Sequence, residues 1–248
     1  KLKMISSEDI EIKLKDRVKL PASLKVHSLF LQQDETFVLD STDTTMKRIH
    51  ADGKATPIVN VMDSSDNGRT YHNYGRDHAY VREQCIINFY EIRNFGASGC
   101  YGMSLFETTS GTQVFKADKT NVFGGVPKAA IVGSQVVVGS TTRLQVYNKR
   151  GVEVKVVAVE SPEFRCEGQV TYSEIKDLCG YDQYSVLLLH DNGVWRADLQ
   201  TGHAKLVTRI TLNAHSVACN KQYIFVGATS QFDRTENLIL VVDRGSGK

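Results

Sequence analysis

A short polar turn that contains glycine recurs five times along this chain of 248 residues, each time after a hydrophobic segment. Successive turn glycines are separated by 58, 40, 51 and 45 residues, and they are Gly53, Gly111, Gly151, Gly202 and Gly247. Glycine suits such turns because it adopts positive φ without a steric cost. Each interval has room for about four short strands. The spacing therefore predicts repeated small antiparallel sheets.

The segments between these turns have the lengths and patterns of β-strands. Ile10–Leu14 alternates apolar and charged side chains, whereas Tyr223–Ala228 and Leu238–Val242 are largely hydrophobic. These patterns are typical of a half-exposed strand and of buried strands. We also expect Ala79–Ile92 to be strand-like, with its core at Ile86–Tyr90, and Val170–Leu178 to be a strand. No segment of useful length has apolar residues at helical spacing, so no long helix is predicted.

Four-stranded sheets that repeat every 40–50 residues or so are the blades of a β-propeller, where each sheet packs against its neighbours. The expected fold is an all-β propeller in one domain, with blades at 22–60, 61–118, 119–158, 159–208 and 209–248. The last blade stops at the turn Gly245–Gly247, before a fourth strand. Ile10–Leu14 is therefore expected to pair beside Leu238–Val242 and complete that blade. The alternative is a ring of six or seven blades, of which this chain is a fragment.

The composition, with 41% hydrophobic and 23% charged residues, is that of an ordinary globular protein. A net charge of +2 does not point to nucleic acid or a membrane surface. No apolar run approaches the roughly 20 residues that span a bilayer. The cysteines are odd in number and widely spaced, which favours reduced thiols used as small core residues. They are Cys85, Cys100, Cys166, Cys179 and Cys219, and they suggest an intracellular protein, cytoplasmic or nuclear.

Four segments share a hydrophobic strand that leads into a polar turn with glycine. They are SLFETTSGTQVF (104–115), RLQVYNKRGVEVKVV (143–157), VWRADLQTGHAKLV (194–207) and LILVVDRGSGK (238–248). These segments resemble the third-to-fourth-strand hairpin of Trp-Asp repeat propellers, and His215 with Val217 and Cys219 is similar to the start of such a blade. No Trp-Asp dipeptide occurs, and Trp195 precedes Asp198 by three residues. The resemblance implies a non-catalytic scaffold for protein partners, within a larger multiprotein complex.

The octapeptide Ser64–Tyr71 supports a second reading. Its pattern Ser-x-Asp-x-Gly-x-Thr-aromatic is similar to the Asp-box of sialidase-like and sortilin-like propellers, where the motif builds a hairpin turn. The resemblance implies a propeller enzyme or a glycan binder. An ordinary turn in which Asp66 bonds its own backbone accounts for the same residues.

Motifs for chemistry are otherwise missing from the sequence. It has no phosphate-binding loop, no dinucleotide fingerprint, no nucleophile elbow and no His-Glu-x-x-His, so no catalytic residue and no cofactor is predicted. His72 with His78, and His215 with Cys219, are among the nearest pairs of candidate metal ligands. Neither pair has a second pair at zinc-finger spacing, so no metal site is predicted.

The richest group of polar and aromatic residues lies between 69 and 80, in and beside a predicted loop. Tyrosine and arginine are enriched at interaction hot spots, and loops on a rigid scaffold concentrate function. We predict a partner-binding site formed by Arg69, Tyr71, His72, Tyr74, Arg76, His78 and Tyr80. A long loop with incidental aromatic residues is the competing interpretation.

The first 25 residues carry seven basic side chains, and this arm offers a third hypothesis. A cationic arm can neutralise phosphates and bind nucleic acid in a salt-dependent way. A solvated surface explains the same composition. The residues are Lys1, Lys3, Lys13, Lys15, Arg17, Lys19 and Lys25.

Overall fold

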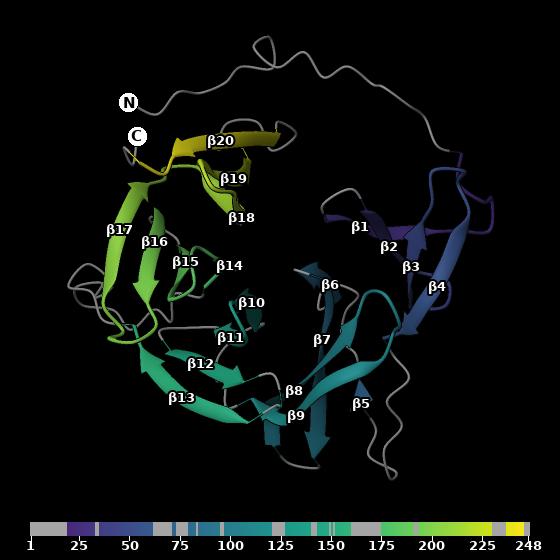
Figure 1. The fold of residues 1–248 in the computed structure, drawn as a ribbon, viewed down its shortest axis with the longest axis horizontal. Helices are drawn as coiled ribbons and strands as arrows, with labels where there is room; N and C mark the ends of the chain where they lie inside the picture. Colours follow the sequence, from purple (N-terminus) through teal and green to yellow (C-terminus); the bar gives the residue numbers. More distant parts are fainter. Residues whose placement is uncertain are drawn as a thin grey trace. The chain divides into compact units, whose positions relative to one another are not determined.

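The computed structural model describes residues 19–32, 35–61, 71–72, 79–82, 84–94, 97–120, 127–139, 143–148, 150, 152–159, 175–190, 193–229 and 237–245 (Figure 1). Within these residues every regular element is a β-strand, and the strands form five antiparallel sheets. The sheets fall into two compact units, here called the β1–β9 unit and the β10–β20 unit. In the described part of the chain, no helix is long and apolar enough to cross a membrane.

The β1–β9 unit contains two sheets. The first is formed in order by β1 (Val26–Gln32), β2 (Glu35–Asp40), β3 (Thr45–Ile49) and β4 (Ala55–Asn60). The second has β7 (Cys85–Asn94), β8 (Ala97–Glu107) and β9 (Gln113–Thr120), with the short strands β5 (Tyr71–His72) and β6 (Ala79–Arg82) both paired to β7. Strand β1 lies beside β6. A shared cluster that includes Phe37, Met46 and Ile86, each 0% exposed, joins the sheets.

The β10–β20 unit contains three sheets of consecutive strands. They are β10 (Lys128–Val132), β11 (Gln135–Gly139), β12 (Arg143–Asn148) and β13 (Glu153–Ala158); β14 (Asp177–Gly180), β15 (Ser185–His190), β16 (Gly193–Asp198) and β17 (Ala204–Arg209); and β18 (Asn213–Cys219), β19 (Tyr223–Thr229) and β20 (Asn237–Asp243). Strand β10 lies beside β14, and β14 beside β18, so the first strands of consecutive sheets are neighbours. Hydrophobic clusters fill the space between each pair of sheets.

The same contact joins consecutive sheets in both units. Gly111, in the turn after β8, packs so closely on β4 that a Cβ atom there would lie 2.2 Å from the carbonyl oxygen of Ile58. Gly202, in the turn after β16, meets β13 in the same way, with 2.4 Å from such an atom to the oxygen of Ala158. A recurring strand order and a recurring packing contact define these sheets as blades. The fold is that of a β-propeller, which confirms the all-β prediction.

The predicted turn glycines are confirmed where the structure describes them. Gly53, Gly111 and Gly202 have φ values of 84°, 68° and 78°, in the left-handed region that favours glycine. Gly151 and Gly247 lie outside the described residues. Cys179, 6% exposed, packs in the cluster between the last two sheets, as expected of a small core residue.

The strand-like region Ala79–Ile92 has its predicted core, Ile86–Tyr90, within β7. The region forms two strands and not one, because the chain reverses between Arg82 and Cys85, which pair with each other. Gln84 makes the turn with φ of 65°, a conformation usually marked by Gly or Asn. Of the predicted strand Val170–Leu178, residues 170–174 lie outside the described residues, and the remainder needs correction. Strand β14 begins only at Asp177, and neither Ile175 nor Lys176 belongs to a strand.

Several predictions fall on residues that the structure does not describe. The strand Ile10–Leu14 is one of them, so its pairing beside Leu238–Val242 stays a prediction. The last sheet consists of β18, β19 and β20 among the described residues. The octapeptide Ser64–Tyr71 also lies outside, apart from the backbone of Tyr71 in β5. Of the basic arm, Lys19 and Lys25 are described, and both are exposed.

Candidate functional site

The predicted partner site at 69–80 is described only in part. Tyr71 and His72 form β5, where they pair with Ile92 and Glu91 of β7, and Tyr80 of β6 pairs with Ile87 of the same strand. Both short strands therefore lie along β7. Arg69, Tyr74, Arg76 and His78 lie outside the described residues, and the site they were predicted to form stays a prediction.

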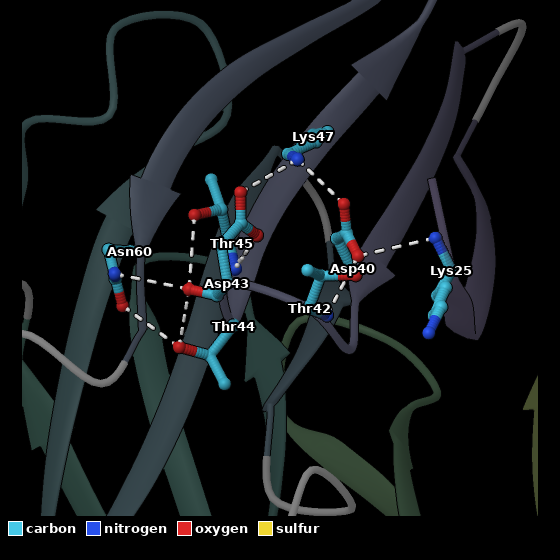
Figure 2. A network of polar contacts seen from close by, with 8 residues as sticks. All are labelled: Lys25, Asp40, Thr42, Asp43, Thr44, Thr45, Lys47 and Asn60. Atoms are coloured by element: carbon cyan, nitrogen blue, oxygen red, sulfur yellow. Dashed lines mark hydrogen bonds and ion pairs between the residues drawn. The ribbon is translucent and has the colours of Figure 1, made fainter. Parts of the chain in front are cut away.

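A network of charged side chains that the sequence reading did not identify lies on the first sheet (Figure 2). Lys47 of β3 bridges two carboxylates: its Nζ lies 2.7 Å from Oδ2 of Asp40 and 2.8 Å from Oδ2 of Asp43. Asp40 ends β2, and Asp43 lies in the turn that leads into β3. Figure 2 shows the ammonium group of Lys47 between the two acids.

The strand register explains why these side chains meet. Val38 of β2 pairs with Lys47 of β3, so Asp40, two residues further along β2, lies on the same face as Lys47. The intervening pair Leu39 and Met46 points the other way, into the cluster shared with the second sheet. The charged network therefore occupies the face of the first sheet opposite its packed core.

Asp40 is buried, with only 3% of its side chain exposed, yet both oxygens are satisfied. Its Oδ1 accepts hydrogen bonds from the backbone nitrogens of Thr42, at 2.9 Å, and Lys25, at 3.3 Å. Its Oδ2 accepts the bond from Lys47. Burial raises the pKa of Asp40, but the bonds from Lys47, Thr42 and Lys25 outweigh it and lower the pKa from 3.8 to about 2.

The other two groups are also held in their charged forms. The hydrogen bond from Lys47 lowers the pKa of Asp43 against the opposing effect of burial. The bonds to Asp40 and Asp43 raise the pKa of Lys47, again against burial. None of the three groups therefore changes charge near neutral pH, as a general acid or base would. The cluster carries a fixed net charge of one negative unit.

A strained turn supports the network. Thr44 has φ of 56°, a left-handed conformation that is unusual for a β-branched residue. Its Oγ1 lies 2.6 Å from the backbone oxygen of Asp43 and 3.2 Å from the side-chain oxygen of Asn60, and the side-chain nitrogen of Asn60 donates to the backbone oxygen of Asp43 at 3.2 Å. Asn60, at the end of β4, thus holds the turn from the neighbouring strand. Strain of this kind is concentrated at functional sites, which makes the turn a candidate.

A hollow of about 400 Å³ opens over the network. Asp40, Thr42, Asp43 and Lys47 form its polar lining, and Asp43 is 47% exposed. The rest of the lining, mostly apolar, comes from the segment before β1 and from β4, and comprises Pro21, Ser23, Leu24, Ala55 and Pro57. The arrangement can accept an extended segment over its apolar side and a positive group beside Asp43.

In the described ranges, no group of three or more His, Cys, Asp or Glu residues is placed to hold a metal ion. The missed signal in the sequence is DSTDTTMK, residues 40–47, which reads as an ordinary Asp- and Thr-rich turn. Only the pairing of β2 with β3 brings Lys47 onto the two acids. Because that pairing is a tertiary contact, residue spacing alone could not reveal it.

Comparison with known proteins agrees on the class of fold, the β-propeller. The chain is similar to a gluconolactonase from Xanthomonas campestris, with a TM-score of 0.54 and 12% identity over 90% of this chain and 74% of the other. It is also similar to regucalcin, a calcium-binding protein from Agrobacterium tumefaciens, with a TM-score of 0.51 and 11% identity over 88% and 75% of the two chains.

A weaker similarity, with a TM-score of 0.48 and 13% identity, relates the chain to BamB from Moraxella catarrhalis, where the match covers 94% of this chain and 66% of that one. No protein-family model matches the sequence, and no curated protein matches it. At these identities the similarity establishes the propeller fold and no more.

Proposed function

We propose that this propeller is a non-catalytic interaction module, and that the hollow on its first sheet binds a partner protein. Like the Trp-Asp repeat propellers that its hairpins resemble, it would serve as one subunit of a larger intracellular assembly, cytoplasmic or nuclear. The observation that carries the proposal is the network of Asp40, Asp43 and Lys47. Its charges are fixed at neutral pH, which suits recognition and gives no proton donor or acceptor for catalysis.

The expected partner segment carries a basic side chain next to apolar residues. Lys47 balances only one of the two carboxylates, and Asp43 is the exposed one. A lysine or arginine of the partner would pair with Asp43, while its apolar neighbours cover Pro21, Leu24 and Pro57. An open hollow that combines apolar surface with a few fixed polar groups suits recognition, because the polar groups set the orientation of what binds.

Charge reversal at Asp43 tests the proposal, and the chain supplies a matched control. Asp43 and Asp52 are both turn residues whose Oδ1 accepts a bond from the backbone nitrogen two residues later, at 3.0 Å and 2.9 Å. Only Asp43 lines the hollow. The immobilised wild-type chain, Asp43→Lys and Asp52→Lys are each incubated with extract of the native cells, and retained proteins are quantified by mass spectrometry.

We expect at least one protein that the wild type and Asp52→Lys retain equally and that Asp43→Lys retains at least about tenfold less. The same purified protein should bind the wild type in solution, with an affinity that falls as salt is raised. Equal retention by the two variants would contradict the proposed site. Hydrolysis of a lactone or a glycoside by the wild type would contradict the non-catalytic role.

A further inference from the structure

The first strands of the last two sheets, β14 and β18, are joined by side-chain contacts at three successive positions along their length. At one end, Oδ2 of Asp177 accepts a hydrogen bond from the backbone nitrogen of Val217 at 2.8 Å. Two residues further along each strand, the sulfurs of Cys179 and Cys219 are 3.8 Å apart. This alternate spacing places both thiols on the sides of the strands that face each other. Both cysteines belong to the β10–β20 unit.

Arg244 closes the far end of this contact. Its guanidinium donates to the backbone oxygen of Tyr181, at 2.8 Å, and to that of Asn220. It also stacks on the ring of Tyr181, with 3.8 Å from the guanidinium carbon to the ring centroid. Tyr181, two residues after Cys179, and Asn220, the residue after Cys219, are therefore bound by the same side chain. The thiols are held between two fixed points, so neither strand can easily slide relative to the other.

We propose that Cys179 and Cys219 are a redox modification site, at which a reversible disulfide joins neighbouring blades. Both are thiols in this structure, and 3.8 Å exceeds the S–S bond length of about 2.05 Å by less than 2 Å. We expect rotation of the two side chains to supply this movement. In an intracellular protein, a pair of this kind is typical of redox sensing.

The surroundings of the two sulfurs assign their roles. Cys219 is partly exposed, so we expect an oxidant to reach its sulfur first, whereas Cys179 is only 6% exposed. Cys179 donates its S–H to Cys219, and Cys219 donates to the backbone oxygen of Gly180 at 2.9 Å. A partly exposed thiol beside a second, buried thiol is the arrangement of an attacking and a resolving cysteine.

The reaction balances with a hydroperoxide as the oxidant. The deprotonated sulfur of Cys219 attacks one peroxide oxygen, the O–O bond breaks, and the products are a sulfenic acid and hydroxide, which takes up the proton lost by Cys219. The sulfur of Cys179 then attacks the sulfenic sulfur, forming the S–S bond and releasing water. With hydrogen peroxide, two thiols and one peroxide give one disulfide and two waters. A dithiol reductant reverses the oxidation.

Oxidation of the full chain under native conditions tests the proposal. The protein is treated with a small excess of hydrogen peroxide, the remaining thiols are alkylated, and the linked peptides are identified by mass spectrometry. We expect one dominant linked pair, Cys179 with Cys219, and a rise in the midpoint of thermal unfolding of several degrees. Dithiothreitol should abolish both the linked pair and the rise. The oxidised and the reduced forms of the same chain are thus compared directly.

Single serine variants separate this pair from the other cysteines. Cys219→Ser should lose the linked peptide and the thermal shift, whereas Cys85→Ser, which changes a cysteine of the other unit, should keep both. If Cys219→Ser fails to fold, the wild-type linkage map still decides the matter. A dominant link to any other cysteine, or irreversible oxidation of Cys219 without a link, would overturn the proposal.

Discussion

Two turns of the molecule have the same backbone and opposite surroundings. In the turn after β2, the nitrogen of Thr44 donates to the backbone oxygen of Asp40 at 2.9 Å, and in the turn after β16, Gly202 donates to Asp198 at the same distance. In each turn, Oδ1 of the aspartate also accepts a bond from the backbone nitrogen two residues later, at 2.9 Å for Asp40 and 2.8 Å for Asp198.

The two turns differ in where the aspartate directs its remaining hydrogen bonds. Among the described residues, the side chain of Asp198 accepts hydrogen bonds within its own turn: its Oδ1 accepts from the backbone nitrogen and the hydroxyl of Thr201, at 2.8 Å and 3.0 Å. Asp40 uses its second oxygen to bind Lys47 on the next strand. Asp198 therefore acts as a turn former, whereas Asp40 forms its turn and also joins that turn to the neighbouring strand.

The residue at the left-handed position differs as well. Gly202 occupies it without strain and gains close packing on Ala158, whereas Thr44 occupies it with a β-branched side chain. A non-glycine residue in this conformation costs roughly 1–2 kcal/mol. The bonds of Asn60 to this turn offset part of that cost. The Asp198 turn thus favours packing between blades, and the Asp40 turn keeps a strained conformation beside the hollow.

The largest expected effect comes from replacing the glycine of the packed turn. Gly202→Ala adds a Cβ atom 2.4 Å from the backbone oxygen of Ala158 at φ of 78°, so we expect a loss of at least about 2 kcal/mol of unfolding free energy. Gly133→Ala is the matched control. Gly133 also has positive φ, 58°, but the nearest atom to its added Cβ is 4.0 Å away.

Urea denaturation of both variants measures the difference. Gly133→Ala should lose only the conformational cost, about 1 kcal/mol. The excess for Gly202→Ala then reports the contact between blades. If the two variants lose the same free energy of unfolding, the close packing of the Gly202 turn does not contribute to stability. The role of the Asp198 turn in packing between blades would then be wrong.

The next largest effect distinguishes Asp40 from Asp198, because replacement by asparagine should cost more stability at Asp40. In Asp198→Asn the side-chain oxygen can still accept every bond that Asp198 accepts through Oδ1, so we expect a loss below about 1 kcal/mol. In Asp40→Asn the new amide nitrogen faces the ammonium of Lys47, which loses a buried partner. We expect a loss of about 2 kcal/mol, limited because Lys47 keeps Asp43. Equal losses would show that Asp40 is merely a turn former.

The pH dependence of the unfolding free energy tests the role of the Asp40 charge over a range of pH instead of at one value. The pKa of Asp40 is lowered from 3.8 to about 2 on folding, so its charge stabilises the fold fully above pH 3.8. That contribution is lost as the pH falls toward 2. The gap in unfolding free energy between the wild type and Asp40→Asn should therefore narrow between about pH 4 and pH 2. A gap that stays constant over this range would contradict the fixed negative charge of Asp40.

The sequence predicted the repeating part of the molecule because the signals for it are local. It missed the site because the site depends on contacts between strands. Strand patterns and turn glycines such as Gly53, Gly111 and Gly202 are local, and local signals are readable from residue order. The site depends on the register that places Val38 opposite Lys47 and on the reach of Asn60 from β4. No local pattern marks these contacts, and a threonine such as Thr44 does not predict a left-handed turn. The turn at Gln84 was missed on the same grounds.

The smallest effect concerns the strained turn itself. Thr44→Gly and Thr44→Ala both remove the hydroxyl that bonds Asn60, so they differ only in backbone preference. At an ordinary position alanine is at least as stabilising as glycine, because glycine loses more conformational freedom on folding. At φ of 56° we expect the reverse, with Thr44→Gly more stable than Thr44→Ala by about 1 kcal/mol in urea denaturation. If alanine is equal or better, Thr44 does not hold a left-handed conformation in solution, and the strain that singles out the Asp40 turn is absent.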